Sequence, residues 1–361
     1  MTNSRVVLLA FFGACVGIAA AGQPPKPLDA RQKALLAELK ACPYQIVWET
    51  YRNGNWDLMA MDADGANKRN ITNTPDIDEM YPHASPDGTR LLFVADQRKG
   101  GTRTHEAYHM PISGTGTRTR VGTNARQPFW SPDGKVVGYM RGVPGRFSES
   151  GSGLKGLYFV DIATGREWEH PRKGLTGLLN LCWSSDGKWL VCTARGSGFA
   201  DAIAAFEANG TRAYEIARCH QEARNVYRCR PDISPDGRHV TWGKCDVNNH
   251  FGLGVRTMWI EICDVDLNAP DRKGTCFRQI VTDHYPWELY HVDWSPDGKY
   301  IVYARGHRGK GRMAGSLPVI GRKAPTWDIW VVKVAQPEVV VQLTHNGLSN
   351  KEPDWVPAAP R

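Results

Sequence analysis

The sequence predicts an all-β protein: a six-bladed β-propeller closed by pairing of its C-terminal strand with the N-terminal blade, plus a short N-terminal helix. The first observation is a Ser-x-Asp-Gly turn that recurs between short apolar runs. The second is its spacing of roughly 46 to 61 residues, which suits blades of four short strands. The third is a partial copy, Pro353-Asp354-Trp355, late in the chain. The full copies occupy residues 85–88, 131–134, 184–187, 234–237 and 295–298.

Each turn indicates a hairpin between the innermost strand of a blade and the strand after it. Proline at the second position presets φ, and glycine at the fourth accepts a positive φ. Three apolar strands between residues 45 and 71 have no innermost strand before them, whereas the strand at 351–356 has no partners after it. Joined, the two ends make a sixth blade, and the closed ring leaves no exposed sheet edge.

The N-terminal segment predicts export. Arg5 precedes an apolar stretch that ends in three alanines, which is typical of a cleaved signal peptide and indicates a periplasmic or secreted protein with no membrane span after cleavage. An uncleaved anchor and a lipoprotein attached at Cys15 are the alternatives. Asp29 is the expected N-cap of the helix. The predicted segments are a signal peptide (1–22), an extension with the helix (23–43), the propeller (44–357) and a tail (358–361).

The composition of the chain limits the classes of ligand that it is expected to bind. The net charge of +8 favours anionic partners, and nucleic acid is not expected because the basic residues are scattered, with no arginine-rich run or aromatic RNA-binding motif. Export permits disulfides, and we expect Cys263 to pair with Cys276 and one further pair among Cys219, Cys229 and Cys245. The chain has no C-x-x-C motif, which argues against a zinc ribbon or a thiol oxidoreductase.

The repeat resembles a known family. The segment Trp294-Ser295-Pro296-Asp297-Gly298-Lys299 with its following apolar strand, and the segment at 57–67 followed by Ile71-Thr72, are similar to the TolB-like repeat, also called the PD40 or WD40-like repeat. The resemblance covers residues 44–357 and implies a propeller. The family includes non-enzymatic periplasmic binding proteins, gating domains of oligopeptidases and polysaccharide lyases. The N-terminal α/β domain of TolB itself, a hydrolase domain and a G-x-S-x-G elbow are all missing from the sequence.

The predicted ligand site lies where the innermost strands begin. The short turns gather on one face of the ring and the long loops on the other, with the connection at 266–275 as the exception. The aligned positions at the mouth of the channel on the long-loop face are all polar, although a water-filled channel would also be partly polar. They are Tyr81, Gln127, Asn180, Arg230, His291 and Glu352.

A second set of candidates is a cationic collar. The strand after each turn ends in a basic residue in several blades, and such a collar suits carboxylates or sulfates. The alternative is that these residues are solvated strand ends or partners of neighbouring acids. The collar consists of Arg141, Arg195, Lys244 and Arg305.

The sequence has no cofactor motif, and a divalent metal is the one cofactor that it suggests. Several histidines map to the long-loop face, and imidazole with carboxylate suits a transition metal. The candidate ligands are His291 and Glu352, together with His220 or His345.

Two functions follow. The first is a non-enzymatic binding scaffold, a monomer, that holds a protein partner or an anionic glycan on its long-loop face. The alternative is a metal- or His/Tyr-dependent lyase, or another carbohydrate-active enzyme, acting on anionic polysaccharide. A lyase needs a charge neutraliser and a base, roles that Arg230, His291, Tyr290 and Tyr81 could supply.

Overall fold

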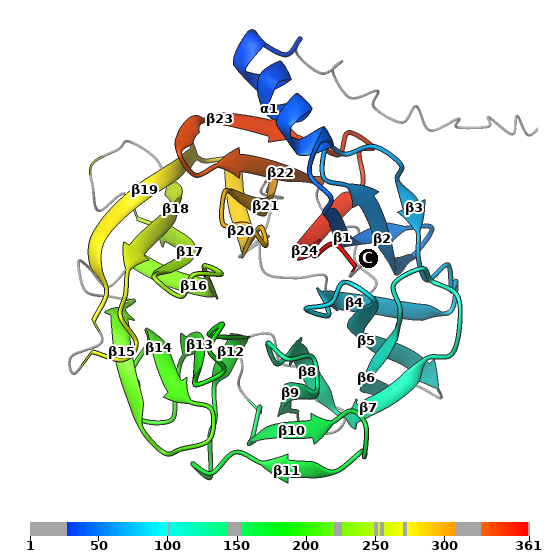
Figure 1. Ribbon diagram of the computed structural model, residues 1–361, viewed down its shortest axis with the longest axis vertical. Helices are drawn as coiled ribbons and strands as arrows, with labels where there is room; N and C mark the ends of the chain where they lie inside the picture. The colour runs from blue at the N-terminus through cyan, green and yellow to red at the C-terminus, as the bar shows by residue number, and fades with distance from the viewer. Residues whose placement is uncertain are drawn as a thin grey trace, which may run out of the picture.

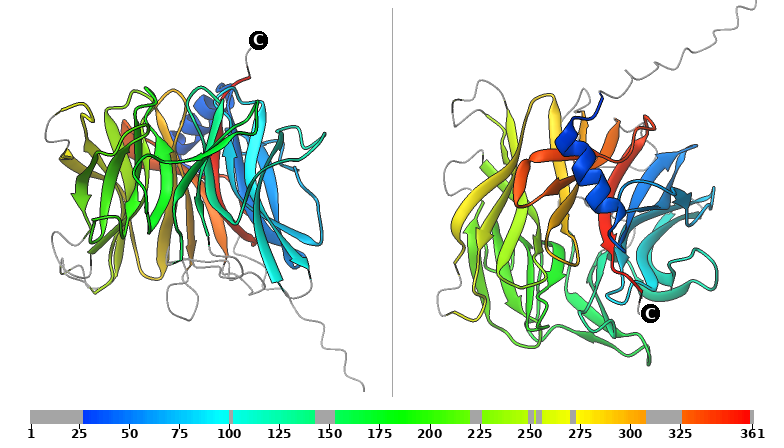
Figure 2. Two further views of the ribbon diagram at one scale, coloured as in Figure 1. Left: turned by 90° about the horizontal axis from the view of Figure 1, so that it is seen from below. Right: turned by 45° about the horizontal axis from the view of Figure 1, so that its top comes forward.

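The computed structural model is a ring of β-sheets around a central axis, and the one helix among its described residues, α1, lies on the outer side (Figure 1). Seen from the side, the strands run between the two faces of a thick disc (Figure 2). The predicted signal peptide at 1–22 lies outside the described residues. The structure describes residues 27–99, 102–142, 153–219, 226–248, 252, 256–269, 273–307 and 326–359.

Four sheets are separate four-stranded antiparallel blades. In each, the strand that ends at a Ser-x-Asp-Gly turn lies nearest the axis (Figure 1). The first has β4 (Ile77–Ala84), β5 (Arg90–Lys99), β6 (Thr102–Pro111) and β7 (Thr119–Thr123). The second has β8 (Ala125–Trp130), β9 (Val136–Arg141), β10 (Leu157–Asp161) and β11 (Glu167–Glu169). The third has β12 (Leu178–Trp183), β13 (Trp189–Ala194), β14 (Ala202–Glu207) and β15 (Ala213–Arg218), and the fourth has β16 (Val226–Ile233), β17 (His239–Asp246), β18 (Thr257–Asp264) and β19 (Thr275–His284).

The other eight strands form one continuous sheet. Its order is β20-β21-β22-β24-β1-β2-β3, with β23 on the free side of β22. The C-terminal strand β24 pairs antiparallel with β1, from Gln45 opposite Val356 to Tyr51 opposite Ser349, so the two ends of the ring are joined. The strands are β1 (Gln45–Arg52), β2 (Asn55–Asp62), β3 (Arg69–Asn70), β20 (Trp287–Trp294), β21 (Tyr300–His307), β22 (Trp327–Lys333), β23 (Gln336–Gln342) and β24 (Ser349–Val356).

The prediction of six separate blades is therefore wrong. The described strands make four separate blades and one eight-stranded sheet. The physical reason is a parallel bridge between Trp327, the first residue of β22, and Ser349, the first residue of β24. This bridge joins the β20–β23 hairpins to the sheet that the two chain ends build together.

The recurring turn is held by its own side chains. In the fifth copy, Ser295 Oγ donates to Asp297 Oδ1 at 2.8 Å and accepts the backbone N–H of Tyr300 at 3.0 Å. The glycine, Gly298, has a φ of +70°, which glycine adopts without a steric penalty. The same Ser–Asp bond occurs in the other copies, including the third, where Ser185 stands in place of proline. The Ser–Asp pair, more than the proline, defines the repeat.

The predicted helix is present as α1 (Ala30–Lys40). The Asp29 side chain accepts the backbone N–H of Gln32, and the Gln32 side chain returns a bond to the Asp29 N–H, which is a capping box. Leu35 and Leu39 are buried in one apolar cluster with residues of β23, against which α1 lies (Figure 2). The helix thus covers the outer strand of the closing sheet.

Two further predictions concern cysteines and membranes. All eight described cysteines are free thiols, so the expected pairs, Cys263 with Cys276 and one among Cys219, Cys229 and Cys245, are absent from the described structure. Within the described ranges, the structure contains no helix with the length and apolar character needed to span a bilayer.

Candidate functional site

The six predicted mouth residues do lie around the axis, and they share an unexpected backbone conformation. Each has a φ between +46° and +57°, in the left-handed region that tyrosine, glutamine, arginine and glutamate seldom adopt. Each lies where the register of its innermost strand slips, as at a β-bulge, and a bulge re-aims a side chain. We call this set the polar ring: Tyr81, Gln127, Asn180, Arg230, His291 and Glu352.

One half of the polar ring is charged. Arg230 Nη1 lies 2.8 and 2.9 Å from the two carboxylate oxygens of Glu352, and His291 Nδ1 lies 2.8 Å from Glu352 Oε2. Burial alone would raise the pKa of Glu352, but Arg230 and His291 outweigh it and lower that pKa to about 2. The Arg230 guanidinium also lies 3.7 Å from the centre of the Tyr290 ring. Arg230 and His291 are therefore both directed at one buried carboxylate.

The other half is neutral. Gln127 Nε2 donates to Asn180 Oδ1 at 3.3 Å, and the backbone N–H of Asn180 donates to Gln127 Oε1 at 2.9 Å. The backbone N–H of Tyr81 donates to Glu49 Oε2 at 2.9 Å. Burial raises the pKa of the Tyr81 phenol to about 12. These bonds link β8 to β12 and β1 to β4, which are strands of different sheets.

Two residues further along three innermost strands, carboxylates hold neighbouring strands together. Asp232 on β16 accepts the backbone N–H of Trp294 on β20 at 2.8 Å, and Asp293 on β20 accepts that of Trp355 on β24 at 2.7 Å. Asp354 on β24 then accepts the N–H of Ala84 on β4 at 2.7 Å. These three residues are named the aspartate latches.

A small hollow lined by both polar and apolar groups lies along the axis. It has a volume of about 60 Å³, and both the polar ring and the aspartate latches contribute to its wall. His83 and Phe129 complete its wall on the β4 and β8 side.

The aspartate latches predict a pH effect on stability. Burial and the charges of Asp354 and Asp232 raise the pKa of Asp293 well above its ordinary 3.8, and Asp293 is hydrogen-bonded to Asp232, which requires a shared proton. A raised folded pKa means that the stability linked to this proton is complete below pH 3.8 and is lost as the pH rises toward the folded pKa. The side chains of His83 and His291 face Asp354 and act to lower its pKa.

Asp293→Asn should therefore raise the free energy of unfolding relative to the native chain by about 1 kcal/mol at pH 8 and by less at pH 5. The amide still accepts the Trp355 N–H and donates to Asp232 without a titrating proton. Urea unfolding at both pH values measures the difference, with the exposed Asp76→Asn as the control. A variant less stable than the native chain at pH 8 would contradict the shared-proton arrangement.

The cationic collar is ion-paired. Each of its four residues lies beside a carboxylate of a neighbouring strand or turn and so already has an acidic partner; Lys244, which shares Glu261 with Arg228, is also buried. The pairs are Arg141 with Glu167 at 2.5 Å, Arg195 with Asp201 at 3.4 Å, Lys244 with Glu261 at 2.9 Å, and Arg305 with Asp283. Binding of anions by the collar stays a prediction, and a ligand would compete with these acids.

The predicted metal ligands are not assembled within the described residues. His291 and Glu352 are in contact. His345 is exposed, and it acts to lower the pKa of Asp328. His220 lies outside the described residues. In the described parts of the chain, no three His, Cys, Asp or Glu side chains gather closely enough to hold a metal ion.

The sequence analysis missed two buried charged residues beside the polar ring. Glu49 on β1 and Lys351 on β24 are directly paired in register and fully buried. The Lys351 ammonium lies 4.9 Å from the centre of the Trp327 ring, and its nitrogen has no hydrogen-bond partner in the described structure. Burial lowers the pKa of Lys351 to about 8, and burial together with Glu352 raises that of Glu49 to about 8. The sequence did contain a signal for this pair, because Lys351 is a lysine in a strand that was predicted to be innermost and therefore buried.

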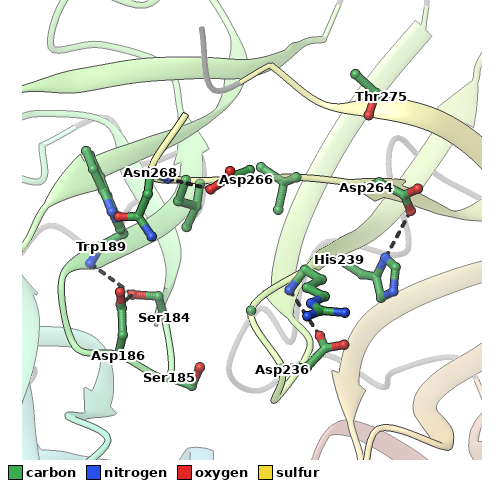
Figure 3. Close-up of a pocket in the computed structure, with 14 residues that line it drawn as sticks. Ser184, Ser185, Asp186, Trp189, Asp236, His239, Asp264, Asp266, Asn268 and Thr275 are labelled. Carbon is green, nitrogen blue, oxygen red and sulfur yellow. Dashed lines mark hydrogen bonds and ion pairs between the residues drawn. The ribbon is translucent and has the colours of Figure 1, made fainter. Parts of the chain in front are cut away.

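Much of the predicted long-loop face lies outside the described residues. On the opposite face, the exceptional connection that begins at Asp266 forms one wall of an open cleft of about 620 Å³ between the third and fourth blades. Its floor includes the turn residues Asp186 and Asp236, and Asp264 bonds to His239 at 3.0 Å (Figure 3). The carboxylates support their own turns and strand ends.

Comparison with known proteins indicates the fold. No known family profile matches the chain. Dipeptidyl-peptidase 5 of Porphyromonas gingivalis is 23% identical over 226 residues, which cover 61% of this chain and 29% of that protein, so the chain spans less than a third of its length.

Two solved structures are similar throughout most of the chain. TolB from Acinetobacter baumannii has a TM-score of 0.62 and 16% identity, covering 87% of this chain and 67% of the other. Kuenenia stuttgartiensis hydrazine synthase has a TM-score of 0.57 and 12% identity, covering 91% and 49%. At these identities the likeness is one of fold: the chain is an all-β, TolB-like propeller with one helix.

Proposed function

We propose that this chain is an exported, non-enzymatic scaffold of TolB-like PD40 repeats that binds a protein partner or an anionic glycan on the face where the innermost strands begin. The ligand lies on the face and does not enter the channel. The polar ring acts as a rigid hub that fixes the strand ends on which the binding surface is built.

The observation that carries this proposal is the closure of the channel. Arg230 reaches across to Glu352, and the hollow beyond the polar ring has a volume of only about 60 Å³. Pockets that enclose a small organic molecule have roughly 300–1,000 Å³, so a sugar ring does not fit. The axis therefore supports a structural role, and binding is left to the surrounding surface.

The same geometry weighs against the lyase alternative. A lyase needs a cation that is free to neutralise a substrate carboxylate, and Arg230 already binds both oxygens of Glu352. A base must lose its proton near neutral pH, and the pKa of Tyr81 is about 12. Tyr290 lies under the Arg230 guanidinium. Of the four groups proposed for catalysis, Arg230, His291 and Tyr290 are each in contact with another protein side chain.

The test measures binding and turnover together. The purified protein is titrated with polygalacturonate, heparin and neutral dextran, with and without added manganese or calcium, while new unsaturated products and reducing ends are followed. We expect binding to an anionic polymer without any new product. Turnover of any polymer, with or without metal, would overturn the scaffold proposal.

A further inference from the structure

Exposed aromatic side chains gather at one place on the binding face. Among the described residues, the large hydrophobic side chains that are well exposed are Phe277 at 43%, Tyr285 at 56% and Trp287 at 40%. Tyr285 and Trp287 flank Pro286 in the turn from β19 to β20, on the face where the innermost strands begin. Phe277 lies elsewhere, on β19, against Trp242. The turn thus presents two aromatic rings to solvent, one on each side of Pro286 in the sequence.

The Trp287 ring is held rigidly although it is exposed. The Arg305 guanidinium lies 4.4 Å from the centre of this ring and 4.8 Å from that of Trp330, and it is bonded to Asp283. The His307 ring meets Trp287 edge-on at 5.5 Å. A ring that is already fixed loses little conformational entropy when a ligand stacks on it.

The polar groups around the two rings suit an oxygen-rich ligand. His284 and His307 are exposed imidazoles at the ends of β19 and β21, next to the turn. The two acids of the turn region are paired, Asp283 with Arg305 and Glu288 with Arg256. The patch therefore offers aromatic surface and imidazoles with its carboxylates neutralised, in a chain whose net charge is +8.

The size of the patch argues for a narrow ligand. A stable protein interface buries about 800 Å² on each side around a core of several large apolar side chains. Among the described residues, two exposed aromatic side chains that are two positions apart in sequence stand out here, and the next one, Phe277, belongs to the outer strand. Pyranose rings have an apolar C–H face of about the area of one aromatic ring, and their hydroxyl and carboxylate oxygens accept hydrogen bonds from imidazole N–H groups.

We propose that Tyr285 and Trp287 form a stacking platform for consecutive sugar rings of an anionic polysaccharide, with the exposed imidazoles of His284 and His307 beside it. This platform rests on the proposed function, of which it names the ligand class and the binding residues. A protein partner at this patch is the outcome that the test must separate from it.

The test uses the full chain, polygalacturonate oligosaccharides as the probe, and titration calorimetry or quenching of tryptophan fluorescence as the measurement. Trp287→Ala should weaken binding at least about tenfold and Tyr285→Ala about fivefold, whereas Trp287→Phe should retain most of the affinity. The matched control is Phe277→Ala, which removes an equally exposed ring outside the platform and should bind as the native chain does. Thermal unfolding confirms that each variant is folded.

The outcomes separate the two proposals. Native affinity in both Trp287→Ala and Tyr285→Ala would overturn the platform and leave the scaffold standing. No binding by the native chain to any polysaccharide would also overturn the platform and leave a protein partner as the ligand of the scaffold. Turnover of the oligosaccharide would overturn the scaffold, and the affinities of the variants would still decide whether the platform exists.

Discussion

Glu352→Gln is expected to lower the free energy of unfolding by about 3 kcal/mol at pH 7. The carboxylate is buried, accepts Arg230 at 2.8 and 2.9 Å, and lies 2.8 Å from His291. An amide of the same shape removes the charge with which Arg230 is paired and leaves the guanidinium beside a neutral group. Urea unfolding followed by tryptophan fluorescence measures the loss.

The effect should depend on pH in a defined direction. Since the folded pKa of Glu352 is lowered from 4.5 to about 2, its contribution is complete above pH 4.5 and declines as the pH falls toward 2. The deficit of the variant should therefore be smaller at pH 3 than at pH 7. Glu338→Gln is the control, because Glu338 is 57% exposed and its pair with Arg31 is expected to contribute less than about 1 kcal/mol. Equal deficits at both pH values would show that the loss is not electrostatic.

Asn350→Ala should be the second large effect, with a loss of about 3 kcal/mol in the free energy of unfolding. The buried Asn350 side chain accepts Trp48 Nε1 at 3.0 Å and Thr50 Oγ1 at 2.8 Å, both on β1. It also donates to the backbone carbonyl of Trp327 at 2.9 Å. Truncation leaves these buried groups unpaired at the place where β1, β22 and β24 meet.

Chemical denaturation at pH 7 measures this loss, and Asn209→Ala is the matched control because Asn209 is exposed on a turn. The control should remain within about 0.5 kcal/mol of the native chain. Because Asn350 joins the N-terminal strand to the C-terminal one, limited proteolysis should also cut the variant faster near β24. A variant as stable as the control would mean that water replaces the side chain without cost.

The sequence was informative where structure is encoded locally. The Ser-x-Asp-Gly turns predicted the hairpins because the serine and aspartate build the turn themselves, as Ser295 and Asp297 do. Asp29 predicted the start of α1 for the same reason, since a cap acts within four residues. The alignment of the repeats also placed the residues of the polar ring around one axis, because each repeat has the same phase.

What the sequence could not provide depends on contacts between distant strands. Nothing local to Tyr81 or Arg230 predicts a positive φ, which is maintained by bonds such as that from the Arg230 N–H to Thr193 Oγ1 on β13. The bridge from Trp327 to Ser349 joins residues on different hairpins, and it turned two expected blades into one sheet. The acidic partners of the cationic collar could not be predicted from the sequence either, because Glu261 and Lys244 come together only through the pairing of β17 with β18.

The strand that closes the ring, β24, is the last strand to be synthesised. β24 supplies Asn350, Glu352 and Asp354, and the ribosome makes it after every other strand of the ring. Until β24 is made, one edge of β1 is unpaired, and another polypeptide could pair with it. Arg230 and His291 also lack the carboxylate of Glu352 until then. If the chain crosses a membrane N-terminus first, the edge of β1 would therefore have to be shielded from other polypeptides after crossing, until β24 follows. Folding would then be completed by one late step, the pairing of β24 with β1.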